Sequence, residues 1–151
     1  MLKLINARDS VNDLEEVMDL IYFEWGQYFS STKETKLNKI KNSIENNLEF
    51  PQVYIMKEND KVIGTFTIKD KDLDNYELSP WISCVIIKPE YRKQGYGRKL
   101  LNYIEEICNK HYPKIYLTTG LVGYYEKIDF KYIENIVRHG CVDRLYIRET
   151  R

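Results

Sequence analysis

Residues 81–101, WISCVIIKPEYRKQGYGRKLL, predict a strand, a loop and a helix in succession. The run from Trp81 to Ile87 is short, apolar and rich in β-branched side chains, and Pro89 stops it. That pattern is typical of a strand buried on both faces. After the loop, apolar side chains recur at helical spacing as far as Cys108, so a helix begins near Gly95 and buries one stripe.

The mouth of this helix has the features of an anion site. Backbone N–H groups are free at a helix N-terminus, which also carries the positive end of the helix dipole, and glycines let an anion approach closely. Gly95 and Gly97 stand there, and four cations surround them: Arg92, Lys93, Arg98 and Lys99. The arrangement favours a polyanionic ligand, most simply a pyrophosphate.

Two familiar phosphate loops do not match these residues. A P-loop ends in Gly-Lys-Ser/Thr, and no such ending follows here. A dinucleotide fingerprint needs a third glycine where this chain has Leu100. A protein that binds a nucleotide through the anion site alone remains an open alternative.

The spacing Arg92-x-x-Gly95-x-Gly97 resembles the signature of the GNAT superfamily of acyl-CoA-dependent N-acetyltransferases, Arg/Gln-x-x-Gly-x-Gly/Ala after a strand. Residues 117–130 look like the family's next motif, a strand and short helix ending Tyr-Glu-Lys-x-Gly-Phe. Three dipeptides resemble one group of small bacterial-type members: Asp72-Leu73, Pro80-Trp81 and His139-Gly140. The motifs stand in the family's order and together cover most of the chain.

The resemblance implies an α/β fold, in which one twisted, mixed but mostly antiparallel sheet of about seven strands has helices on both faces. The apolar patterns and turn residues agree with that order. We expect strands at residues 2–7, 52–57, 61–69, 81–87, 114–118, 130–138 and 142–148. We expect helices from Asp9 or Ser10 through Phe29, over 37–48, from Gly95 to Cys108, and over 121–127.

Length and composition place the protein in the soluble globular class. At 151 residues it has the size of a single domain, and 23 basic residues balance 23 acidic ones, so nothing indicates binding to nucleic acid or to an anionic membrane. Cys84, Cys108 and Cys141 lack Cys-x-x-Cys spacing, which indicates a reduced protein without structural zinc. No apolar run approaches the length of a membrane span. We expect a cytoplasmic monomer or homodimer that uses no metal.

Acetyl-CoA is the acyl donor that the resemblance implies. The pyrophosphate is then expected on Arg92, Lys93, Gln94, Gly95, Tyr96 and Gly97, with Arg98 in addition. In the family, the central strand splays from the next one and its backbone binds the pantetheine arm. By position the residues concerned are Val85, Ile86 and Ile87, whose side chains we expect in the core. A backbone N–H near Val85 would also stabilise the oxyanion formed from the thioester.

Tyr125, the tyrosine of the Tyr-Glu-Lys element, is the predicted general acid for the departing CoA thiolate. A thiol and a phenol have pKa values of about 8.5 and about 10, so the proton transfer carries only a small penalty. Its neighbour Tyr124 is the alternative. Asp129 stands where the motif has glycine, and aspartate tolerates a left-handed conformation less well, so we expect the short helix to end differently.

An amine acceptor must lose a proton, because an amine with a pKa of about 10.4 is almost entirely charged at neutral pH. Glu77, in the acidic and irregular segment before the central strand, is the predicted base, directly or through water, with Asp72 and Asp74 behind it. Cys84 is not expected to act as a nucleophile, since no histidine lies near it in sequence and a thiol buried in a strand is usually inert.

These features predict an N-acetyltransferase that moves an acetyl group from acetyl-CoA to a primary amine of a small molecule or protein by direct attack. Specificity for the acceptor would reside in the first two helices and in residues 70–79, which we expect to be exposed. The alternative from another class is a non-catalytic regulatory module that binds acyl-CoA through Arg92 to Gly97 and does not depend on Tyr125.

Overall fold

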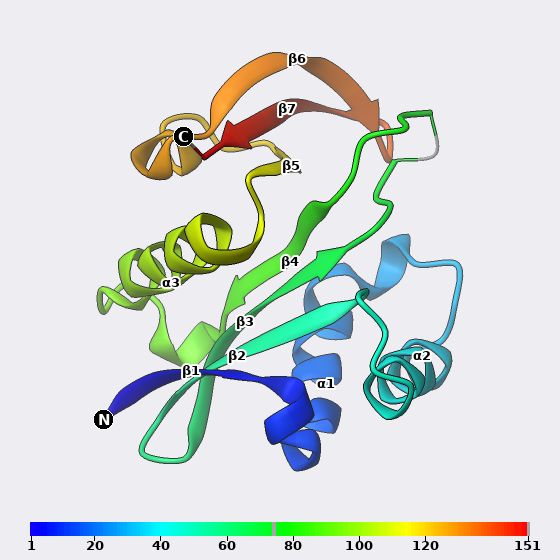
Figure 1. The fold of residues 1–151 in the computed structure, drawn as a ribbon, viewed down its shortest axis with the longest axis vertical. Helices are drawn as coiled ribbons and strands as arrows, with labels where there is room; N and C mark the ends of the chain where they lie inside the picture. Colours follow the sequence, from blue (N-terminus) through cyan, green and yellow to red (C-terminus); the bar gives the residue numbers. More distant parts are fainter. Residues whose placement is uncertain (74, 151) are drawn as a thin grey trace.

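One sheet of seven strands organises the protein in the computed structural model, which describes residues 1–73 and 75–150. The strands are β1 (Leu2–Asn6), β2 (Gln52–Glu58), β3 (Lys61–Lys69), β4 (Trp81–Ile87), β5 (Lys114–Thr119), β6 (Lys131–Arg138) and β7 (Cys141–Glu149). They lie in the order β1-β2-β3-β4-β5-β7-β6, and all neighbours are antiparallel except β4 and β5. The predicted mixed, mostly antiparallel sheet is therefore confirmed (Figure 1).

Three α-helices pack on the sheet within the described residues: α1 (Leu14–Trp25), α2 (Lys33–Glu45) and α3 (Tyr96–His111). The helices α1 and α2 lie on one face and α3 on the other, as expected (Figure 1). Five short 3-10 helices join the larger elements: η1 (Ala7–Asp9), η2 (Val11–Asp13), η3 (Gly26–Tyr28), η4 (Pro89–Tyr91) and η5 (Tyr125–Ile128). Among the described residues, no helix is both long and apolar enough to cross a bilayer.

The side chains of β2 alternate between two hydrophobic cores, one on each face of the sheet. Tyr54 and Met56 pack in the cluster that contains the apolar stripe of α3. Val53 and Ile55 pack in the cluster that contains α1. Because successive side chains of a strand point to opposite faces, one strand contributes to both cores and is buried along nearly its whole length.

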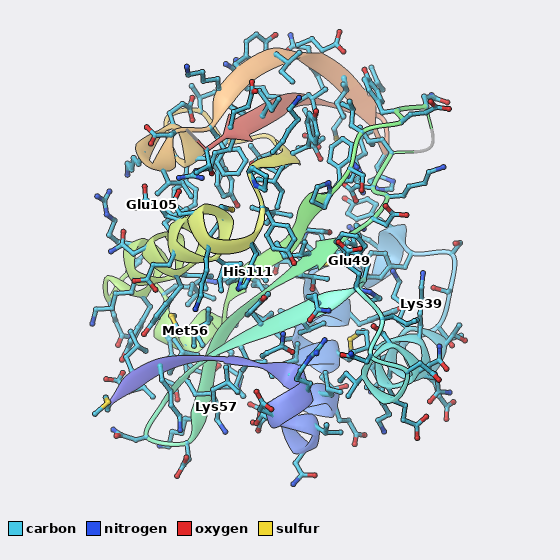
Figure 2. All side chains as sticks on the ribbon, viewed as in Figure 1. Lys39, Glu49, Met56, Lys57, Glu105 and His111 are labelled. Carbon is cyan, nitrogen blue, oxygen red and sulfur yellow. The ribbon has the colours of Figure 1, made fainter. Side chains whose placement is uncertain are left out.

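The first helix begins later than its sequence predicts. Residues 7–13 form two 3-10 helices, and α1 starts at Leu14 rather than after Asp9 or Ser10. The Ser10 hydroxyl donates to Asp13, whose carboxylate also accepts from Lys57 Nζ in β2 at 2.7 Å (Lys57 is labelled in Figure 2). Side chains that resemble a helix cap therefore tie the connection between β1 and α1 to the sheet instead.

The helix predicted over residues 121–127 is also smaller in the structure. It is the 3-10 turn η5, which begins only at Tyr125. This turn ends at Asp129 with φ 72°, the left-handed conformation that glycine would adopt. The backbone N–H of Phe130 then donates to Tyr125 O at 3.3 Å. The expectation that aspartate would change this helix end is wrong, because Asp129 follows the same backbone path at some conformational cost.

The strands β4 and β5 diverge soon after they meet. Among the described residues, Trp81 with Tyr116 is their one paired position, whereas β3 stays beside β4 from Lys69 to Gly64 (Figure 1). Beyond Trp81, the side of β4 that faces β5 is therefore a strand edge whose backbone groups have no ladder partner there.

A bulge in β4 lies at the same level as this opening. Thr67 of β3 opposes Ser83 and Thr65 opposes Ile86, so Cys84 and Val85 together oppose a single residue of β3. Cys84 has φ 55°, which is rare for a residue with a β-carbon. Bulges re-aim backbone and side chains and are common next to active sites.

Candidate active site

A cavity of about 420 Å³ occupies the opening between β4 and β5. Residues 82–85 of β4 form one wall. Residues 117–121, at the end of β5 and just beyond it, form the other wall. Further residues close its ends: Trp25, Tyr28, Phe29, Lys69, Asp72, Tyr125, Arg138, His139, Cys141 and Asp143. A cavity of this size is typical of a site for a small molecule or part of a cofactor.

The three residues predicted to bind pantetheine occupy different places. Val85 is half-buried and lines the cavity, whereas Ile86 is buried opposite Thr65 and does not line it. Ile87 is half-buried at the end of the strand, where its carbonyl oxygen accepts from Arg92 Nε at 2.9 Å. Their side chains contribute to the core, as expected, since Ile86 is buried and Val85 and Ile87 pack against the main cluster, so any role in binding falls to the backbone of this edge.

The structure separates the two adjacent tyrosines that the sequence left as alternatives. Tyr125 is 7% exposed and lines the cavity. Tyr124 is not among the lining residues, and its hydroxyl instead donates to Gly97 O in the first turn of α3 at 3.3 Å. Burial, and then the neighbouring Tyr124, raise the pKa of Tyr125, so its phenol keeps its proton well into the alkaline range.

Free backbone N–H groups converge at the mouth of α3. In the described part of the chain, the N–H groups from Lys93 to Arg98 have no protein acceptor, and that of Lys99 is the first to donate, to Gly95 O at 3.4 Å. The loop turns sharply here, because Lys93 has φ 63° and Gly95 has φ 87°. Apart from its two neighbours in the chain, no described residue has an atom within 4 Å of the position that a β-carbon on Gly95 would take, so this face of the loop is open.

The side chains predicted to bind pyrophosphate divide into two groups. Lys93 and Arg98 are exposed and free to turn toward an anion. The others support the loop: Arg92 donates to Ile87 O, Gln94 Nε2 donates to Glu90 O at 3.0 Å, and the Tyr96 hydroxyl donates to Glu58. Arg92 also lies 3.6 Å from Glu24 of α1, between Nη2 and Oε2, and keeps part of its side chain exposed. For Gln94 and Tyr96 the backbone is therefore the part available to an anion.

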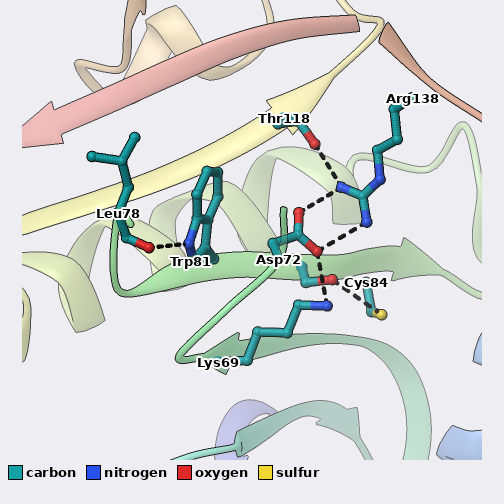
Figure 3. A network of polar contacts seen from close by, with 8 residues as sticks. Lys69, Asp72, Leu78, Trp81, Cys84, Thr118 and Arg138 are labelled. Carbon is teal, nitrogen blue, oxygen red and sulfur yellow. Dashed lines mark hydrogen bonds and ion pairs between the residues drawn. The ribbon is translucent and has the colours of Figure 1, made fainter. Parts of the chain in front are cut away.

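The segment before β4 is irregular, as predicted, but it is not uniformly exposed. Asp72 is 3% exposed in its side chain, and it accepts from Arg138 Nη1 and Nη2 and pairs with Lys69 (Figure 3). Burial would raise the pKa of Asp72, but the hydrogen bonds and charges of Arg138 and Lys69 outweigh it and lower the pKa. A carboxylate held in this way is a weak base, so Asp72 supports the site rather than accepting a proton.

Glu77, the predicted base, is exposed and lines neither this cavity nor its neighbour. Asp74, predicted to stand behind it, lies outside the described residues. The next side chain toward the N-terminus, Tyr76, reaches the hairpin instead, where its hydroxyl donates to Glu134 at 3.0 Å. The structure therefore does not bring Glu77 together with Tyr125.

A second cavity of about 500 Å³ adjoins the first and shares Phe29, Lys69, Ser83 and Cys84 with it. It lies beneath α1 and α2, and sequence patterns did not single out most of its residues. Cys84 was expected to be buried in a strand, but it is half-buried and lines both cavities, because the bulge turns it out of the regular pleat. For the residues of this cavity that lie on helices, the one sequence signal of a role in binding was their place in the two predicted N-terminal helices.

The thiols and carboxylates that the structure describes do not gather into a metal centre. Within residues 1–73 and 75–150, no group of three or more His, Cys, Asp or Glu side chains is placed to hold a metal ion. Cys108 is buried on the core face of α3, and burial raises the pKa of its thiol to about 12. That thiol is protonated and unreactive at neutral pH.

Comparison with known proteins supports the motif-based resemblance. The model of the acetyltransferase (GNAT) family matches residues 14–130, which include the α3 mouth and Tyr125. No curated protein matches the sequence. Several solved structures match nearly the whole chain, and at their low identities the likeness concerns the fold.

Spermidine N-acetyltransferase from Vibrio cholerae, solved with CoA and spermine, is 19% identical with a TM-score of 0.71 over 96% of this chain and 94% of that one. A putative acetyltransferase from Salmonella typhimurium, solved with acetyl-CoA, is 14% identical with a TM-score of 0.71 over 99% and 94%. A GNAT-family acetyltransferase from Bacillus cereus is 18% identical with a TM-score of 0.69 over 100% and 99%. With its family model matched from α1 through the end of η5 and its fold shared with these structures, the chain belongs to the GNAT family of acetyltransferases.

Proposed function

We propose that this protein transfers an acetyl group from acetyl-CoA to a primary amine by direct attack on the thioester. The observation that carries the proposal is the alignment of three features along one path. Free N–H groups lie at the α3 mouth, an unpaired strand edge follows along β4, and a cavity lined by Tyr125 lies beside that edge. A pyrophosphate, a pantetheine arm and a thioester need such features in that order.

The donor would be held mainly by backbone groups. The N–H groups of residues 93–98 would receive the pyrophosphate, with Lys93 and Arg98 adding charge from the exposed side. The β4 edge at Val85, Ile86 and Ile87 would pair with the amide groups of pantetheine as an added strand. Because Val85 stands in the bulge, its N–H is a candidate for the oxyanion donor.

The chemistry balances with one acid and one base. A base first takes one proton from the acceptor's ammonium group, and the neutral amine nitrogen then forms a bond to the thioester carbon. The C–S bond breaks, and the nitrogen loses its second proton to solvent as it becomes an amide. Tyr125 would give its proton to the departing sulfur, which is feasible because its raised pKa keeps the phenol protonated before the step. The phenolate formed would regain a proton from solvent.

Glu77 remains the predicted base, and its exposed position restricts it to action through water. A Glu77→Gln variant tests this role directly. If Glu77 relays the proton, the variant should lose kcat/KM below about pH 8, where the amine is almost entirely charged, and lose less at higher pH. An unchanged pH profile would remove Glu77 from the mechanism.

The decisive experiment compares Tyr125→Phe with Tyr124→Phe. Loss of a general acid should lower kcat by about 100-fold in the Tyr125 variant while the affinity for acetyl-CoA stays the same. The Tyr124 variant is the matched control, because its hydroxyl contacts α3 rather than the cavity. A non-catalytic acyl-CoA-binding module would show no turnover in either protein and equal affinity in both.

The donor class can be tested before any acceptor is known. Calorimetric titration with acetyl-CoA, CoA, ATP and NAD should show selective binding of acetyl-CoA and CoA, weakened in Arg92→Ala because the variant loses the bond that ties the loop to Ile87. Comparable binding of ATP and NAD would favour a general nucleotide site. No binding of acetyl-CoA by folded protein would contradict the proposal.

A further inference from the structure

The cavity beneath α2 is lined by an excess of cations. Four lysines line it, Lys36 and Lys39 from α2, Lys69 from β3 and Lys71 from the following loop, against one acid, Asp70. Lys39 is labelled on α2 in Figure 2. The charge balance of the whole chain is even, so this imbalance is local to the cavity.

Most of that positive charge has no counterion among residues 1–73 and 75–150. Among the described residues, Lys36, Lys39 and Lys71 take part in no ion pair. Lys69 pairs with Asp72 at 2.8 Å, but Asp72 also pairs with Arg138, so this group of three keeps one net positive charge. Asp70 is exposed and accepts a hydrogen bond from Ser79 at 2.7 Å.

Lys36 is partly buried and packs against an aromatic ring. Its Nζ lies 4.1 Å from the centre of the Phe29 ring, and Phe29 lines both cavities. Burial is the main cause that lowers the pKa of Lys36. The charge of Lys69, and to a smaller extent that of Lys39, lowers it further, whereas Cys84 and Asp72 act in the opposite direction. Cations that repel one another in a partly buried cavity are stabilised by a bound anion.

Most of the remaining lining is apolar, apart from Thr67, Ser83 and Cys84. Six residues provide it: Met18, Ile21, Phe29, Ile40, Phe50 and Pro51. A ligand that fills this space therefore needs an apolar body as well as a negative group. At about 500 Å³ the cavity accommodates an amino acid with a large apolar side chain.

We infer that this cavity is the acceptor site and that the acceptor is an amine carrying a carboxylate beside an apolar body, the class of apolar amino acids. The inference rests on the proposed function, because the shared wall at Ser83 and Cys84 would place the amine next to the thioester. The carboxylate would lie among Lys36, Lys39 and Lys71, and the apolar side chain would lie against α1 and α2.

The same lysines would disfavour binding of two other acceptor classes, and they would make a bound amino acid more reactive. Polyamines and aminoglycosides carry several positive charges, which a cationic cavity repels. For a bound amino acid, nearby cations lower the pKa of the ammonium group, so a larger fraction of the acceptor is neutral and able to attack. This effect reduces the demand on a base, which agrees with the exposed position of Glu77.

A binding experiment isolates the role of the carboxylate. The probes are N-acetylphenylalanine and N-acetylphenethylamine, which differ only in that group, titrated into protein saturated with CoA. We expect the acid to bind at least about tenfold more tightly. In the double variant Lys36→Gln, Lys39→Gln, this preference should fall below about threefold, whereas Lys41→Gln, an exposed lysine of α2 outside the cavity, should retain it.

Turnover provides a second measurement with the same logic. Acetyl-CoA consumption should show higher kcat/KM for phenylalanine than for phenethylamine, phenylalanine amide or spermidine. The preference for phenylalanine over phenethylamine should be reduced in the double variant. Phenylalanine amide represents the amino end of a peptide, so equal rates for it and phenylalanine would indicate a protein acceptor and overturn the inference.

The two proposals fail in different ways. If the neutral probe binds as tightly as the acid, or if neither binds to protein that binds CoA, the acceptor inference is wrong while the transferase proposal stands. A preference that is unchanged in the double variant also overturns it. If acetyl-CoA itself does not bind, the proposed function fails, and the acid preference of the cavity can still be measured in the free protein.

Discussion

Arg138 at the end of β6 and Asp72 in the loop before β4 form a two-bond ion pair, with Nη1 2.5 Å from Oδ2 and Nη2 3.0 Å from Oδ1 (Figure 3). Arg138 Nη1 also donates to Thr118 of β5 at 2.9 Å. Both residues line the cavity between β4 and β5. The pair therefore joins the three segments that border the opening and fixes its width. The negative charge of Asp72 is used in this ion pair, so its role is structural.

Replacing Asp72 with Asn should destabilise the protein. We expect a loss of about 2 kcal/mol at pH 7, below the about 3–5 kcal/mol of a fully buried pair, because Arg138 and Lys69 remain 25% and 28% exposed. Urea unfolding measures this loss as a lower midpoint with an unchanged m-value. Glu77→Gln, in the same segment but exposed, should leave the midpoint unchanged.

The loss of stability caused by Asp72→Asn should depend on pH in a defined direction. The pKa of Asp72 is lowered in the folded protein, so its contribution is present above the unfolded pKa of about 3.9 and disappears as pH falls through the folded value. The difference in unfolding free energy between wild type and Asp72→Asn should therefore be constant from pH 7 to 5 and shrink below about pH 3.9. A difference that grows on acidification would contradict the assignment.

The sequence was informative where function depends on local backbone pattern. The β4 strand is confirmed at Trp81–Ile87 and α3 begins at Tyr96, because apolar periodicity and the glycines are local signals. The opening between β4 and β5 has no such signal, since it depends on how far two strands stay paired. Asp72 looked like a loop charge because its partner Arg138 stands far away in sequence and only the fold brings them together.

The left-handed turn at Gly95 should be sensitive to a side chain. With φ 87°, Gly95→Ala should cost about 1–2 kcal/mol of stability or force the loop to rearrange, and the affinity for acetyl-CoA should fall in either case. Gly95→Asn should lie between glycine and alanine, because asparagine tolerates this conformation better. Gly120→Ala is the control for stability alone, because Gly120 lines the cavity: its φ is not positive and its β-carbon would lie 3.6 Å from Asp143, an ordinary contact. Unfolding midpoints and calorimetry measure the two effects.

The pH profile of turnover should reflect the buried phenol of Tyr125. Burial raises its pKa above the usual value of about 10, and the protonated form is the active general acid. The rate constant kcat should therefore show no fall from pH 7 to about 9.5, measured with acetyl-CoA and acceptor both saturating. A descending limb near pH 8 that disappears in Tyr125→Phe would mean that the phenol is more acidic than its surroundings imply.

The thiol of Cys84 provides a direct probe of where the donor binds. It lines both cavities, whereas Cys108 is buried. Cys141 is exposed at the start of β7 and lines the first cavity. In a Cys141→Ser background, iodoacetamide should modify Cys84 alone, and acetyl-CoA at ten times its Kd should slow that modification about tenfold by occupying the opening. Unchanged alkylation in protein that binds acetyl-CoA would place the thioester elsewhere.

Direct attack on the thioester also predicts the outcome of removing this thiol. Cys84→Ala keeps the β-carbon, so the left-handed backbone at φ 55° carries no new strain and the bulge should persist. The variant should retain kcat within about threefold, because the amine and not the thiol forms the bond to the acetyl carbon. An acyl-cysteine intermediate would instead make turnover collapse in Cys84→Ala and leave an acetylated Cys84 in wild-type protein incubated with acetyl-CoA alone, which mass spectrometry of the intact chain would detect.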